Sequence, residues 1–225
     1  MSKGYIFDLD GTLLDTELVW IAVMERLFAA HEISITHEQV IKIVCGRAAS
    51  DIYKDTVAVS NGKLSDVGAI AAEAYKYFEE MKESTDIRIN GSIELLKRLS
   101  KTSPVCIASG SPRVVIEEGI KYMGVEENVS FFLGSEDYAV GKPNPTVFLL
   151  AAEKLGLEPK DCVVFEDSCP GVTAAKRAGM KCVAVVLPNH PKQDVSQADA
   201  ILDDLSKSEK EMFQEFLLED VEAPQ

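Results

Sequence analysis

Hydrophobic residues follow two different spacings along this chain. From about residue 90 onward, short continuous apolar runs alternate with longer segments in which apolar residues recur at helical intervals. The short runs predict buried strands, because a strand covered on both faces is apolar throughout, and the longer segments predict helices. Strands are expected at residues 4–7, 105–108, 131–133, 162–165, 182–186 and 200–202, and helices at residues 92–100, 112–123, 145–155 and 170–178.

The stretch between the first two predicted strands has a different pattern. Residues 16–86 contain no strand-like run and predict helices at 18–31, 38–44, 50–59 and 64–82. Thr16 stands where an N-cap is expected. We therefore predict a core domain formed by residues 1–15 and 87–225, interrupted by an all-helical module at residues 16–86.

Apolar strands that alternate with amphipathic helices predict an α/β fold in which a Rossmann-like parallel sheet carries helices on both faces. Ligands of such sheets bind outside the carboxyl ends of the strands, so polar side chains are expected to follow the strands. They do: Asp8 and Asp10 follow the first strand, Ser109-Gly110-Ser111 follows the second, and Glu166-Asp167-Ser168 follows the fourth, with Lys142 in a Gly/Pro loop.

Asp8 and Asp10 are the first candidates for chemistry. Residues two apart in an extended chain project from the same side, so both carboxylates face the end of the first strand. Neighbouring carboxylates repel unless a cation or a shared proton relieves them, which indicates a metal or acid/base site. The alternative for a lone Asp-x-Asp-Gly is a solvated turn, since Asp and Gly are common turn residues.

Each of the later candidates also has a structural interpretation. Ser109 could cap the following helix, since serine is a favoured N-cap residue. Lys142 could be a solvated surface charge. Glu166 and Asp167 precede a helix start, where acidic residues complement the helix dipole. Their recurrence at one predicted sheet edge favours a shared site.

Composition and charge exclude several classes of function. The 225-residue chain has a formal net charge of -14, which argues against binding to nucleic acid or to an anionic membrane surface. It has no apolar run of membrane-spanning length and no signal-peptide layout, so we expect a cytoplasmic protein. The five cysteines lack metal-type spacing, and we interpret them as structural thiols.

The string FDLDGTLLDTE, which begins at Phe7, resembles the nucleophile motif of the haloacid dehalogenase (HAD) superfamily. Ser109, Lys142 in GKPNP and Glu166-Asp167 in FEDS resemble the other three motifs of that superfamily, in the same order. The resemblance spans residues 4 to about 187. It is strongest to members with a helical cap, in the branch that contains β-phosphoglucomutases and sugar phosphatases.

The resemblance implies a mechanism and a set of roles. Asp8 is the implied nucleophile and forms an aspartyl-phosphate, while Asp10 acts as general acid and base. Mg²⁺ is the implied cofactor, held by Asp8, the backbone carbonyl of Asp10 and Asp167, with Glu166 acting directly or through water. The implied phosphate and substrate contacts are Thr12, Ser109, Gly110 and Lys142 in the core and Trp20, Gly46, Arg47 and Lys76 in the cap.

Two departures from the mutase pattern favour hydrolysis. Trp20 replaces a histidine and Ala49 replaces an arginine that β-phosphoglucomutases carry. Trp20 has packing in the cap core as its alternative role, and Arg47 and Lys76 have surface charge as theirs. We expect a monomeric phosphatase for a small-molecule phosphate ester, with a sugar phosphate as the expected substrate. A phosphohexose mutase is the alternative, and a dehalogenase or a non-catalytic phosphometabolite-binding protein is less favoured.

Overall fold

The computed structural model describes residues 3–45, 47, 49–188, 190–203 and 205. The chain divides into two compact units, Met1–Leu13 with Ile89–Gln225, and Leu14–Arg88. We call them the sheet unit and the helical unit and describe each by itself. In the described part of the chain, no helix combines the length and the apolar character needed to cross a bilayer.

The sheet unit is built on a six-stranded parallel sheet, which confirms the predicted fold class. Its strands are β1 (Gly4–Phe7), β2 (Val105–Ala108), β3 (Phe131–Leu133), β4 (Cys162–Glu166), β5 (Lys181–Val185) and β6 (Ala200–Leu202), in the spatial order β3-β2-β1-β4-β5-β6. β1 therefore lies between β2 and β4, with Phe7 opposite Ile107 on one side and Phe165 on the other. This register brings the ends of three strands to one edge.

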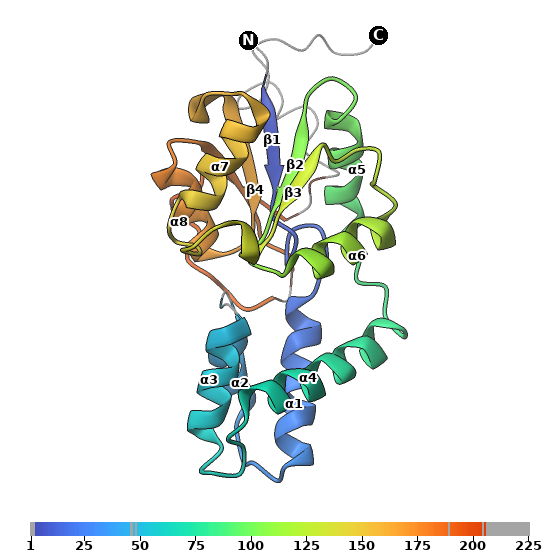
Figure 1. The fold of residues 1–225 in the computed structure, drawn as a ribbon, viewed down its shortest axis with the longest axis vertical. Helices are drawn as coiled ribbons and strands as arrows, with labels where there is room; N and C mark the ends of the chain where they lie inside the picture. Colours follow the sequence, from blue (N-terminus) through green and yellow to red (C-terminus); the bar gives the residue numbers. More distant parts are fainter. Residues whose placement is uncertain (1–2, 46, 48, 189, 204, 206–225) are drawn as a thin grey trace. The chain divides into compact units, whose positions relative to one another are not determined.

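Helices cover both faces of the sheet, as the continuous apolar runs predicted (Figure 1). Helices α7 (Thr146–Leu155) and α8 (Cys169–Arg177) lie on one side, and α5 (Asn90–Leu99) and α6 (Arg113–Met123) lie on the other. Under α7 and α8, Ile6, Val164 and Phe148 belong to a fully buried cluster. Three of the cysteines, Cys106, Cys162 and Cys182, are buried and free within strands.

Helix boundaries follow the caps more closely than the hydrophobic pattern. The helix expected at residues 64–82 begins at Val67, because the Asp66 side chain accepts hydrogen bonds from the first-turn N–H groups of Gly68 and Ala69. The expectation for Thr16 is only half met. It occupies the N-cap position of α1 (Glu17–Ala30), but its backbone is helical and its side chain makes no capping hydrogen bond.

The helical unit contains α1, α2 (His37–Val44), α3 (Ala49–Val59) and α4 (Val67–Lys82). Its core includes buried side chains of α1, such as Met24 and Leu27, and α1 packs against α4. Where the unit joins the rest of the chain, Leu14 and Arg88 form an antiparallel bridge.

Candidate active site

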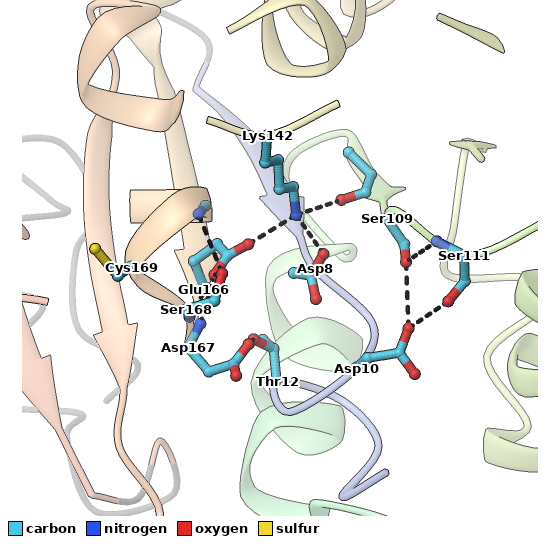
Figure 2. A network of polar contacts seen from close by, with 12 residues as sticks. Asp8, Asp10, Thr12, Ser109, Ser111, Lys142, Glu166, Asp167, Ser168 and Cys169 are labelled. Carbon is cyan, nitrogen blue, oxygen red and sulfur yellow. Dashed lines mark hydrogen bonds and ion pairs between the residues drawn. The ribbon is translucent and has the colours of Figure 1, made fainter. Parts of the chain in front are cut away.

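Side chains that follow three different strands meet at the carboxyl edge of the sheet (Figure 2). Asp8 and Asp10 follow β1, Ser109 follows β2, and Asp167 follows β4, whose last residue is Glu166. Because β1 is paired in parallel with both β2 and β4, the three strand ends are neighbours. The structure thus brings together candidates that lie up to 159 residues apart, from Asp8 to Asp167.

Lys142 joins two of the carboxylates. Its Nζ lies 2.5 Å from Oδ1 of Asp8 and 2.7 Å from Oε1 of Glu166, and it also donates to the carbonyl oxygen of Ala108 at 3.3 Å. The Lys142 side chain is only 11% exposed, against 8% for Asp8 and 1% for Glu166. A lysine buried between two carboxylates is a component of the site and not a solvated surface charge.

The pKa values show how the site distributes charge. The pKa of Asp8 is raised to about 7, chiefly because burial disfavours its charged form. The positive charge of Lys142 lowers this pKa only in part, and the negative charges of Glu166 and Asp10 raise it further. Burial acts to lower the pKa of Lys142, but the Asp8 and Glu166 carboxylates outweigh it and hold that pKa well above its usual range. Lys142 therefore stays charged, and the site keeps an excess of negative charge.

Glu166 is fully engaged by protein groups. Its Oε1 accepts from Lys142, and its Oε2 accepts from the backbone N–H groups of Asp167 and Ser168 at 2.8 and 2.7 Å and from the Ser168 hydroxyl at 2.9 Å. These bonds shape the loop that carries Asp167. Gly171 was not predicted as a site residue, yet a Cβ there would lie 1.7 Å from Glu166 Oε1. A glycine in the first turn of a helix is costly, and that cost was the available signal.

Thr12 contacts Asp167. Its hydroxyl donates to Asp167 Oδ1 at 3.2 Å, and Thr12 is fully buried. The neighbouring Gly11 has a φ of +81°, and a Cβ there would lie 2.2 Å from Asp167 Oδ2. In the structure the Thr12 hydroxyl orients a carboxylate. The substrate contact that the resemblance implies for Thr12 stays a prediction.

The carboxylates fit a small divalent cation. One oxygen each from Asp8, Glu166 and Asp167 lie within 4.8 Å of one another. Mg²⁺ prefers oxygen ligands at about 2.1 Å, so ligands on opposite sides of the ion are about 4 Å apart. Because both Glu166 oxygens are already hydrogen-bonded, Asp8 and Asp167 are the better direct donors. The negative charge that Lys142 does not neutralise favours binding of a cation, because buried carboxylates are costly without a partner.

The Asp10 carboxylate faces away from this cluster. Its Oδ2 accepts from the Ser111 hydroxyl at 2.5 Å and from the Ser109 hydroxyl at 3.4 Å. Asp10 would therefore meet a metal ion only through its backbone carbonyl. Between the two serines, a Cβ on Gly110 would meet no described atom within 4 Å, so the site is open at this point.

Two further residues at this edge were given no role from the sequence. Ser111 holds Asp10, and Tyr138 donates from its hydroxyl to the Ser109 carbonyl at 2.9 Å. Ser111 lies two residues beyond Ser109 in a polar SGS segment, which was a usable signal. For Tyr138 no sequence pattern pointed to the site.

The remaining candidates belong to the helical unit. Trp20 stacks on Phe78 with ring centroids 4.8 Å apart, which matches the packing role that the sequence left open. Arg47 forms an exposed ion pair with Asp55. Lys76 is exposed on α4, and Gly46 lies outside the described residues.

Comparisons with known proteins give a family and several relatives. The family model described as haloacid dehalogenase-like hydrolase matches residues 5–185. The chain is 31% identical over 208 residues to validoxylamine A 7'-phosphate phosphatase of Streptomyces hygroscopicus subsp. limoneus, covering 92% of this chain and 96% of the relative. It is 29% identical over 208 residues to hexitol phosphatase A of Escherichia coli strain K12, covering 91% of this chain and 92% of the relative.

The structural comparison agrees at the level of the fold. A crystal structure of β-phosphoglucomutase from Clostridium difficile matches with a TM-score of 0.78 at 23% sequence identity, covering 96% of each chain. At this identity the likeness concerns the fold alone. The choice between hydrolysis and phosphoryl rearrangement therefore depends on the site residues.

Proposed function

The chain belongs to the haloacid dehalogenase-like hydrolase family, and we propose that it is a Mg²⁺-dependent phosphatase that hydrolyses a small sugar phosphate through an aspartyl-phosphate. The observation that carries this proposal is the convergence of Asp8, Lys142 and Asp167 at one sheet edge. The two relatives reported above are named as phosphatases, one of validoxylamine A 7'-phosphate and one of hexitols.

Asp8 is the proposed nucleophile. One of its carboxylate oxygens attacks phosphorus, a bond forms between Asp8 and the phosphoryl group, and the bond to the alcohol oxygen breaks. Lys142 holds Oδ1 of Asp8 and leaves the second oxygen for attack. The positive charge of Lys142 also offsets the repulsion between an anionic nucleophile and an anionic substrate.

Asp10 is the proposed general acid and base. It gives a proton to the departing alcohol oxygen and then takes a proton from the water that attacks the aspartyl-phosphate. That attack releases inorganic phosphate and restores Asp8. The Ser109 hydroxyl and the N–H groups around Gly110 bind the phosphoryl oxygens.

Asp8 and Asp167, with the backbone carbonyl of Asp10, are the residues that would hold Mg²⁺. When bound, the ion neutralises charge on the carboxylates and on the phosphoryl oxygens. Thr12 and Glu166 keep Asp167 in place through the contacts described above. Glu166 would act through water, because its own oxygens are occupied.

The direct test is hydrolysis with and without the metal. With Mg²⁺ we expect phosphate release from p-nitrophenyl phosphate and from a panel of hexose and hexitol phosphates. Excess EDTA is expected to reduce the rate at least about 100-fold, because a metal supplies several kcal/mol of charge stabilisation. Added Mg²⁺ should restore it. Full activity in EDTA would contradict the metal-dependent mechanism.

The same assay separates the alternatives. A mutase would convert a hexose phosphate into its isomer with little release of inorganic phosphate. A binding protein without activity would shift its melting temperature with phosphorylated ligands but hydrolyse none of them. Phosphate release that equals substrate loss is the result expected here.

We propose that residues 16–86 act as a cap that selects the substrate, with Arg47 and Lys76 as its polar contacts. Replacing Lys76 by alanine is expected to raise KM for the preferred sugar phosphate about tenfold, the cost of losing a charged hydrogen bond, with kcat nearly unchanged. The matched control is Lys54→Ala, which removes an exposed lysine from α3. Equal KM values in the two variants would exclude Lys76 from substrate selection.

A further inference from the structure

The general acid proposed above is held by a hydrogen bond that the sequence motifs do not include. Ser111 donates its hydroxyl to Asp10 Oδ2 at 2.5 Å, much closer than the 3.4 Å contact from Ser109 (Figure 2). A hydrogen bond to a carboxylate at this distance is among the stronger ones in proteins. Of the two serine hydroxyls that donate to Asp10, that of Ser111 is therefore the closer.

Ser111 is itself fixed on both sides by its backbone. Its N–H donates to Ser109 Oγ at 3.0 Å, and its carbonyl oxygen accepts from the N–H of Ser135 at 3.0 Å. The first contact lies within the loop after β2, and the second joins that loop to the segment after β3. A side chain on a backbone held in this way has a defined direction, as a positioning residue requires.

The Ser109 hydroxyl has two competing uses. It has a single proton, which in the structure is directed toward Asp10. When Ser109 binds a phosphoryl oxygen, as proposed above, that proton leaves Asp10. The Ser111 hydroxyl keeps its own bond to Asp10, so Asp10 remains oriented while Ser109 serves the substrate.

We propose that Ser111 is the positioning residue of Asp10, and that it allows Asp10 to protonate the leaving oxygen while Ser109 is engaged with phosphate. This inference rests on the proposed function, in which Asp10 is the general acid. In that step the bond between phosphorus and the leaving oxygen breaks, the bond between phosphorus and Asp8 forms, and the Asp10 proton goes to the leaving oxygen. Removing the Ser111 hydroxyl leaves the nucleophile and the cation ligands unchanged.

The test compares leaving groups that differ in their need for an acid. Nitrophenolate departs without protonation, whereas the more basic phenolate benefits from it. We measure kcat/KM for p-nitrophenyl phosphate and for phenyl phosphate with Mg²⁺, since kcat/KM reports the transfer to Asp8. For Ser111→Ala the ratio of the two values, nitrophenyl over phenyl, is expected to rise at least about tenfold, because a general acid contributes 10²–10⁴-fold.

This ratio does not depend on how much of a preparation is folded, because both substrates meet the same protein. Ser111→Thr keeps a hydroxyl and is expected to hold the ratio within about threefold of wild type. Ser196→Ala is the matched control: it removes a serine hydroxyl that donates to a carboxylate, that of Asp194 at 2.6 Å, in an exposed turn. Its ratio should equal that of wild type.

Three results would overturn the inference, and a fourth would overturn the proposed function on which it rests. Equal losses on both substrates with a raised KM would mean that Ser111 binds the phosphoryl group instead. If Ser111→Thr raised the ratio as much as Ser111→Ala does, the hydroxyl would not be the group that positions Asp10. A wild-type protein that hydrolyses neither substrate would contradict the proposed function itself, whereas active wild type with an unchanged ratio in Ser111→Ala would contradict only the role of Ser111.

Discussion

Replacing Asp8 by asparagine is expected to reduce phosphate release by about 10⁵-fold or more, the scale seen when a catalytic nucleophile is removed. The amide has nearly the same shape as the carboxylate and still accepts a hydrogen bond from Lys142. It cannot form an aspartyl-phosphate. The measurement is kcat for p-nitrophenyl phosphate with Mg²⁺, and rapid quenching should detect no phosphorylated protein.

The same substitution is expected to leave the protein at least as stable as wild type in EDTA. Asp8 is buried beside the Glu166 and Asp10 carboxylates. Its pKa is raised to about 7, mainly by burial and further by these like charges. Above that pH the wild-type fold carries an unfavourable negative charge that the amide removes. A lower melting temperature at pH 8 would show that the carboxylate supports the fold. Near-normal turnover would exclude Asp8 as the nucleophile.

Replacing Lys142 by methionine is expected to have the second largest effect, on both stability and activity. Methionine has a similar length but leaves the buried Asp8 and Glu166 carboxylates without their shared cation. Leaving buried charges without their partner costs about 3–5 kcal/mol of unfolding free energy. Asp8→Asn does not incur this cost, because Lys142 stays paired with Glu166. Turnover should fall about 10³–10⁵-fold, as for other cationic groups that stabilise phosphoryl transfer.

The stability effect should depend on the metal. In urea unfolding, Mg²⁺ is expected to stabilise Lys142→Met more than wild type, because a divalent cation offsets part of the charge that Lys142 no longer neutralises. The matched control is Lys121→Met, which breaks an exposed pair with Glu117 and should change stability very little. If the two methionine variants were equally stable in EDTA, Lys142 would not be a structural cation of the site.

The parallel sheet was predictable from the sequence because its strands are apolar on both faces. Val105–Ala108, Phe131–Leu133 and Ala200–Leu202 were predicted with the bounds that the structure has. Helix ends were less predictable, since they depend on single capping contacts. The Asp66 side chain starts α4 at Val67, three residues after the apolar pattern begins.

The candidate site was predictable as a set of residues but not as a set of contacts. Asp8, Glu166 and Asp167 could be picked out because ligands of such sheets bind at the carboxyl ends of the strands. Lys142 could be picked out because its GKPNP segment resembles a motif of the same family. Which side chain holds which could not be foreseen. Thr12 contacts Asp167 and Ser111 contacts Asp10, and both pairs join segments that are far apart in the sequence.

The sequence by itself determined the alternation of strands and helices, the inserted helical stretch, the identity of the acids at the strand ends and that of the lysine in the Gly/Pro loop. Hydrophobic periodicity and local turn chemistry are sufficient for that, since both act between near neighbours in the chain. Only the tertiary structure decided that Lys142 lies between Asp8 and Glu166, and that Asp10 faces two serines. These pairings depend on the order β3-β2-β1-β4-β5-β6, which places the ends of β2 and β4 on either side of β1, and no local pattern specifies it.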